Sequence, residues 1–221
     1  MDTALRFNIY APIHKAFRLF MADTLARLGR LDLGDAHDLA AGLGQLDALL
    51  EAACCHLRHE NDFIHPAIEA CSGGASHRIA AEHREHLEAV DALRAQAAAL
   101  RATPGPAAAH RLYRQLAAFI AENFEHMDVE ETRHNQALWA AYGDAELQAI
   151  EGRILASIGP EEMGQWLHWM LLAFSPVERA QLVAGLPPEA RAPVLAEARR
   201  LLDGAAWAKL ARALDQEPVA A

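Results

Sequence analysis

Helix-breaking residues fall in short, well-separated clusters, and this spacing is the strongest constraint on the fold. They leave long stretches at about residues 11–28, 35–70, 75–102 and 107–142. Ala and Leu, which favour helices, are abundant in these stretches, whereas strand-forming residues are scarce. Long helices joined by short links pack most simply as an up-down bundle. The sequence therefore predicts an all-α chain built on an antiparallel four-helix bundle.

The C-terminal third has a different pattern. It predicts shorter helices at about residues 144–157, 161–174, 176–184 and 188–214, separated by Gly159-Pro160, Ser175-Pro176 and Pro187-Pro188. The apolar face from Met163 to Met170 predicts packing on the bundle or, alternatively, a surface for a protein partner or a homodimer. We expect a bundle domain over 1–143 and a C-terminal helical extension over 144–221.

The charge and the N-terminal sequence exclude several classes of function. The formal net charge is −10, and no basic block occurs, which argues against nucleic acid or an anionic membrane surface as a partner. No apolar stretch is long enough to span a bilayer, and the N-terminus does not resemble a secretory signal. Cys54, Cys55 and Cys71 form no disulfide framework. We expect a cytoplasmic protein.

Two His-Glu pairs with identical spacing are the chemically informative motif. His56 and Glu60 lie four residues apart in the second expected helix, and His126 and Glu130 lie four apart in the fourth. Residues four apart share one face of a helix, so each pair presents an imidazole and a carboxylate together. Two such helices facing each other predict half of a dinuclear metal site. Mixed nitrogen and oxygen donors suit iron or manganese.

The other two helices offer histidines at matching heights. When the chain folds back at its breakers with equal rise per residue, His56 and Glu60 lie opposite about residues 85 to 89, and His126 and Glu130 opposite about residues 78 to 82. His83 and His86 fall between these levels, and His14 on the first helix lies level with about residue 58. All four helices can therefore bring donors to one height. The alternative is a set of surface histidines on Ala-rich helices.

The segments HLRHENDFIHPAI (56–68), EHREH (82–86) and HMDVEE (126–131) resemble hemerythrin-like, or HHE cation-binding, domains of the bacterial type. The resemblance covers roughly residues 5 to 142 and implies two non-haem iron ions joined by an oxo or hydroxo bridge. Manganese or zinc is the alternative metal. The implied metal ligands, with both carboxylates bridging, are His14, His56, Glu60, His83, His86, His126 and Glu130.

Two departures from the oxygen-carrying hemerythrins qualify this ligand set. The fourth helix has HxxxE in place of HxxxxD, and the third has HxxH in place of HxxxH, so only one of His83 and His86 need bind the metal. His59 is a candidate substitute ligand, and His134 could line the pocket. His65 lies nearly opposite His56 on a straight helix, which predicts a place outside the site unless Pro66 distorts the helix.

The expected site leaves an open position for a small molecule, because seven ligands and one bridging atom do not fill two six-coordinate metals. We expect reversible binding of O2 or NO as sensor, carrier or scavenger, and an enzymatic role is the less favoured reading. The alternatives are a di-iron enzyme that reduces peroxide or NO or donates iron to damaged iron centres, and a helical interaction module with a structural metal.

Overall fold

The computed structural model describes residues 6–72 and 76–216, without the side chains of residues 72, 76–82 and 216. Every regular element in this part of the chain is helical. The chain divides into two compact units. The first holds the described residues up to Ala11 together with Phe20–Ile158, and the second holds Pro12–Leu19 together with the described residues from Gly159 onward. The predicted domain boundary after residue 143 stays a prediction, because a division into compact units does not test where a domain ends.

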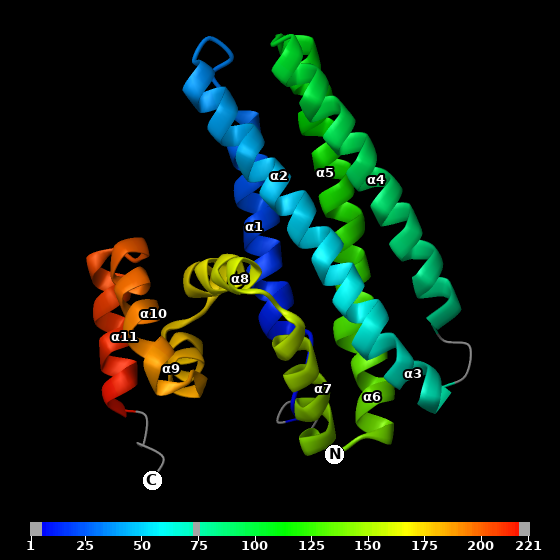
Figure 1. Cartoon of the computed structure of the whole chain (residues 1–221), viewed down its shortest axis with the longest axis vertical. Coiled ribbons are helices and arrows are strands. Elements are labelled where there is room, and N and C mark those ends of the chain that lie inside the picture. Colours follow the sequence, from blue (N-terminus) through cyan, green and yellow to red (C-terminus); the bar gives the residue numbers. More distant parts are fainter. Residues whose placement is uncertain (1–5, 73–75, 217–221) are drawn as a thin grey trace. The chain divides into compact units, whose positions relative to one another are not determined.

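The predicted four-helix bundle is confirmed (Figure 1). Its long helices are α1 (Ala11–Gly29), α2 (Ala36–His59), α4 (Ser76–Ala102) and α5 (Pro106–Val129). Two of them have short helical continuations, since α3 (His65–Ser72) follows α2 and α6 (Asn135–Ala141) follows α5. A further helix, α7 (Asp144–Ser157), belongs to the same unit.

Side-chain contacts show that neighbouring helices are antiparallel. Between α2 and α4, Arg101 bonds to the Leu43 carbonyl near one end, and Arg94 bonds to Glu51 further along. Residue numbers therefore rise along α2 in the direction in which they fall along α4, so the two helices are antiparallel. Gln45 of α2 likewise bonds to Asp23 of α1, in line with the tight reversal between these two helices.

The turn between α1 and α2 shows how the sequence enforces this reversal. Asp35 caps α2, because its carboxylate accepts the backbone N–H groups of His37 and Asp38. Gly42 lies where Leu31 folds back on the helix, and a Cβ atom there would stand 2.3 Å from Leu31 Cδ2. Glycine at this position lets the incoming chain approach closely.

An apolar cluster closes the end of the bundle where α3, α6 and α7 lie. It comprises Ile9, Tyr10, Ile64, Ile68, Leu138, Leu147 and Ile150. The segment before α1 is fixed to this end, because Arg6 contacts Asp144 and the Trp139 and Tyr142 carbonyls, and Trp139 donates to the Phe7 carbonyl. Tyr10, the residue before α1, is therefore held at a defined place.

The second unit has a small hydrophobic core of its own. Its helices are α8 (Pro160–Ala173), α9 (Pro176–Gly185), α10 (Pro188–Leu201) and α11 (Gly204–Gln216). Within this unit, Phe17 packs edge-on against Trp166 and Lys15 pairs with Glu178. One expectation is wrong here, since residues 188–214 form two helices and not one. The break falls at Leu202 and Asp203, and the Asp203 carboxylate accepts the Ala206 N–H at the start of α11.

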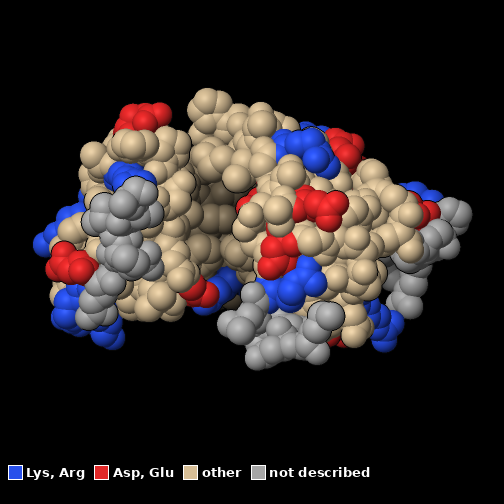
Figure 2. Space-filling view, turned by 90° about the horizontal axis from the view of Figure 1, so that it is seen from below, with Lys and Arg blue, Asp and Glu red and all other residues tan. Residues whose placement is uncertain are grey.

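In the part of the chain that the structure describes, no helix combines the length and apolar character needed to cross a membrane. Figure 2 shows Asp and Glu side chains interspersed with Lys and Arg on one face of the molecule.

Candidate metal centre

The two His-Glu pairs both end at a π-helical turn. One turn covers Glu60–Ile64 between α2 and α3, and the other covers Glu130–His134 between α5 and α6. In each, the N–H of the next residue donates to the glutamate carbonyl five residues back, at His65 and at Asn135. Such turns add one residue to a helix and are frequent at functional sites. The sequence patterns predict straight helices here, so the turns are a new finding.

The glutamate and histidine side chains of these turns meet inside the bundle. His56 Nε2 lies 3.1 Å from Glu60 Oε1, and His126 Nε2 lies 3.2 Å from Glu130 Oε1. His83 of α4 places its Nε2 atom 3.6 Å from Glu60 Oε2. The two oxygens of Glu60 therefore face imidazoles of two different helices.

Four of these side chains form one compact set of donors. One donor atom from each of Glu60, His83, His126 and Glu130 lies within 4.8 Å of the others, and all four side chains are buried. The Nε2 atoms of His83 and His126 are 3.1 Å apart. Two imidazoles bound side by side to one metal at about 2.1 Å bring their nitrogens to about 3 Å, so the spacing fits a shared ion. Buried carboxylates beside imidazoles are a donor set suited to a metal cation.

Burial holds His83 in the form that binds metals. Its pKa falls from 6.5 to about 2, because burial disfavours the charged ring and His126, His65, His86 and His134 surround it. A neutral imidazole has a lone pair for a metal. Asn61, on the π-helical turn, accepts from His83 Nδ1 at 3.0 Å and leaves the Nε2 lone pair directed at the donor set. Sequence reasoning missed Asn61, which adjoins a predicted ligand but carries no spacing signal of its own.

His86 and His14, the other two predicted histidine ligands on α4 and α1, are both buried. His86 is buried, with its ring 4.9 Å from that of His126 and 6.2 Å from that of Phe119, but its nitrogens are not among the clustered donor atoms of the described residues. His14 is buried on α1. Its role as a ligand stays a prediction.

His65 lies closer to the donor set than a straight helix predicts. The π-helical turn shifts the phase of the helix, and His65 is buried with its ring 4.7 Å from that of His83. The distortion comes from this turn, which precedes Pro66. A signal for it exists in the sequence, since a further histidine follows each His-Glu pair, His65 after Glu60 and His134 after Glu130. His59 is buried near Phe63 and lies outside the clustered donors of the described chain.

Tyr10 is a further buried group near the donor set. It is buried, and its pKa is raised well above the ordinary value by burial and then by the charges of Glu130 and Glu60. Its ring lies 6.5 Å from that of His134. The phenol therefore stays protonated beside the two carboxylates.

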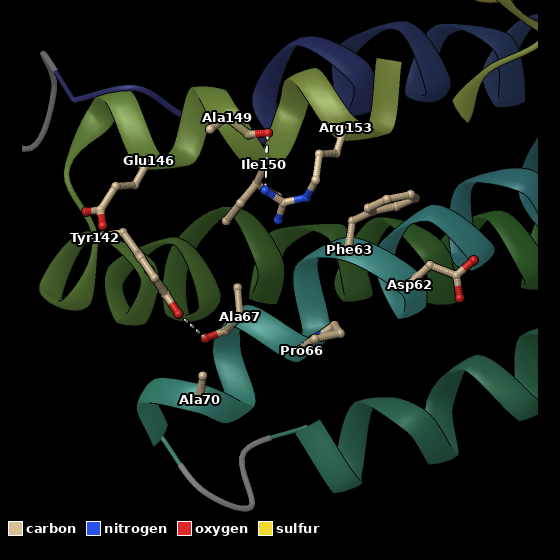
Figure 3. A pocket seen from close by; sticks show the side chains of 10 residues that line it. All are labelled: Asp62, Phe63, Pro66, Ala67, Ala70, Tyr142, Glu146, Ala149, Ile150 and Arg153. Carbon is tan, nitrogen blue, oxygen red and sulfur yellow. Dashed lines mark hydrogen bonds between the residues drawn. The ribbon is translucent and has the colours of Figure 1, made fainter. Parts of the chain in front are cut away.

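A surface groove lies outside this donor set, between the first π-helical turn with α3 on one side and α7 with the preceding Tyr142 on the other (Figure 3). Its volume is about 600 Å³. The lining residues are Asp62, Phe63, Pro66, Ala67, Ala70, Tyr142, Glu146, Ala149, Ile150 and Arg153. Tyr142 Oη donates to the Ala67 carbonyl across the floor. None of the predicted metal ligands lines the groove, so the buried donors and the groove are separate features.

Comparison with known proteins gives one match. The family model of the hemerythrin HHE cation binding domain matches residues 8–136. No curated protein and no solved structure matches the chain. The matched segment covers α1 to the start of α6 and includes every donor described above. The chain belongs to the hemerythrin HHE cation-binding family.

Proposed function

We propose that this protein holds two non-haem iron ions and reversibly binds O2 or NO at an open metal position, as a sensor, carrier or scavenger. One ion is held by Glu60, His83, His126 and Glu130, and the other by His14, His56 and the same two carboxylates. His86, beside His126, completes the proposed ligands.

The orientation of Glu60 carries this proposal. Its Oε1 atom faces His56 of α2 and its Oε2 atom faces His83 of α4, at 3.1 and 3.6 Å. A carboxylate whose two oxygens face different imidazoles is placed to bridge two ions rather than to hold one. Glu130 stands in the same core against His126. A pair of buried glutamates suits two cations, because an ionised carboxylate away from water needs a compensating charge.

Small ligands suit this site better than large ones. The donors are buried, and an apolar cluster closes the bundle end next to them. The protein supplies four or five donor atoms to each ion, which leaves room for an added ligand on a six-coordinate metal. An organic substrate would fit the groove of Figure 3, but that groove contains none of the donors.

Metal analysis of protein produced in iron-rich medium is the first test. We expect about two iron ions per chain, following the dinuclear bundle pattern. The double variant Glu60→Ala/Glu130→Ala should lose them, because both bridges are removed. A matched control, Glu122→Ala/Glu125→Ala, changes two exposed glutamates of α5 and should leave the iron content unchanged. Full loading of the first variant would overturn the bridging assignment.

Ligand addition is the second test. Azide or NO added to the iron-loaded protein should produce a new ligand-to-iron absorption band, because a position is open. An unchanged spectrum would favour a closed, structural metal. Repeated turnover of peroxide or NO would favour the enzymatic alternative over reversible binding.

A further inference from the structure

Two buried histidines near the donor set are not part of it. His65 and His134 are each less than a tenth exposed, and each comes at or just after the end of a π-helical turn. In an uninterrupted α-helix His65 would lie about 140° round from Glu60, but the extra residue reduces this to about 40°. The same correction brings His134 from about 80° to about 20° of His126. Both turns therefore rotate a histidine toward the site.

The neighbours of these histidines place them on one side of the donor set. The His65 ring stacks 4.7 Å from His83, at an interplanar angle of 32°. The ring of His134 lies 6.5 Å from that of Tyr10, a member of the apolar cluster that closes this end of the bundle. His65 thus lies against a proposed metal ligand, and His134 lies against a residue of the apolar end cap.

The buried Nε2 atom of His65 has an unusual environment for a polar atom. The His65 side chain is buried, and an imidazole ring always carries at least one N–H donor. Its buried Nε2 atom makes no hydrogen bond with any described residue. A buried polar nitrogen without a partner is costly, and a ligand would remove that cost.

We propose that His65 and His134 line a pocket for a small inorganic anion beside the metal ions, and hydrogen-bond that anion without binding metal themselves. This inference rests on the proposed function, because it places the pocket at the open metal position. Tyr10 forms the far wall. The apolar cluster behind it excludes water, which strengthens hydrogen bonds to a charged ligand.

Azide binding to the iron-loaded, full-length protein tests the pocket. The variants are His65→Phe and His134→Phe, which remove the N–H groups, and His65→Gln and His134→Gln, which keep a donor. His110→Phe, at an exposed position of α5, is the control. Iron per chain and the azide dissociation constant, from optical titration, are measured for each protein.

We expect all variants to keep the iron content of the parent. Each Phe variant should weaken azide binding about tenfold, the usual effect of losing a hydrogen bond to a charged group, and each Gln variant less than about threefold. Where a Phe variant does not fold, the corresponding Ala variant should show the same loss. The control should match the parent.

Two results would overturn the pocket. Unchanged azide affinity in the Phe or Ala variants would show that these histidines do not contact the anion. Loss of iron from the same variants would show that they are metal ligands. Failure of the proposed function looks different, since the parent protein itself would then bind no azide.

Discussion

At the residue scale, the hydrogen bond from His83 to Asn61 shows how one neutral side chain orients a proposed metal ligand. Asn61 Oδ1 accepts from Nδ1 of His83, so the hydrogen sits on that nitrogen and the lone pair on Nε2. His83 faces both Glu60 and His126 with this Nε2 atom. The orientation of the ring is therefore set from the side opposite the clustered donor atoms.

Replacing Asn61 by Leu should weaken iron binding while leaving the fold intact. We expect about a tenfold loss of metal affinity, the low end for a partner of a metal-binding histidine, because Asn61 is exposed and water can take its place. Competition with a metal chelator measures the affinity. Asp62→Ala, the next residue on the same turn, is the matched control, and equal affinities for the two variants would contradict the role of Asn61.

The stability of the metal-free protein should fall in acid. The pKa values of His65 and His83 in the folded chain are about 4 and about 2, below the ordinary 6.5. The unfolded chain therefore binds more protons than the folded one below about pH 6.5, so their contribution is complete above that pH and is lost as pH falls toward 4 and below. Urea unfolding should show about 2–4 kcal/mol less stability at pH 5 than at pH 7.

A variant can show whether these histidines cause the pH dependence of the free energy of unfolding. His65→Phe removes one of the two groups, so its stability should change less steeply with pH than that of the parent. If the free energy of unfolding of the parent is constant between pH 7 and pH 5, the histidines are not held neutral by burial.

The spacing of His and Glu allowed the core of the site to be predicted, but not its surroundings. Positions four apart share a helix face in any α-helix, so His56, Glu60, His126 and Glu130 could be grouped before the fold was known. Asn61 could not, because one asparagine on a helix has many roles. His65 was predicted to lie away from the site unless the helix is distorted; it is not among the clustered donors of the described residues, but the π-helical turn brings its ring next to His83, which arithmetic at 100° per residue does not anticipate.

At the element scale, breakers and caps predicted where helices end better than they predicted breaks inside them. The observed bounds of α1, α4 and α7 agree with the sequence patterns to within a residue. Proline and glycine fix such ends through the backbone itself. The two π-helical turns contain no proline or glycine and give no such signal, whereas Asp203-Gly204 marks the break after Leu202, although one continuous helix is predicted there.

The segment before α1 gives a prediction about how elements are joined. Arg6 bonds to the Asp144 carboxylate and to the carbonyls of Trp139 and Tyr142. Arg6→Ala should lower the free energy of unfolding by about 1–3 kcal/mol, because it leaves partly buried acceptors without a charged donor. Urea denaturation measures the loss, and Arg30→Ala, at an exposed position after α1, should change little. A loss below about 0.5 kcal/mol for Arg6→Ala would show that this contact is solvated and weak.

At the scale of the whole molecule, one helix contributes to both compact units. Ala11 and Phe20–Gly29 of α1 belong to the first unit, and Pro12–Leu19 to the second. The four-helix pattern is readable from sequence because each helix buries its own apolar stripe. The second unit also contains Pro12–Leu19, about two turns of α1, and nothing in the local sequence of α1 signals this. The helix breakers therefore predicted only a C-terminal extension over 144–221, and this domain division stays a prediction.

A chain ending at Ile158 should test what the second unit contributes. All the proposed metal ligands lie before that residue, so we expect about two iron ions per chain, as in the full-length protein. Its melting temperature should fall by several degrees, since Phe17 loses Trp166 and Lys15 loses Glu178, and apolar surface of α1 becomes exposed. Trp166→Ala in the full chain separates the two effects, because it removes the Phe17 contact and keeps the other helices. If the shortened chain folds with the helix content of the bundle but binds no iron, the C-terminal helices are needed to shape the metal centre, and His14 on the shared stretch of α1 is the ligand they would act through.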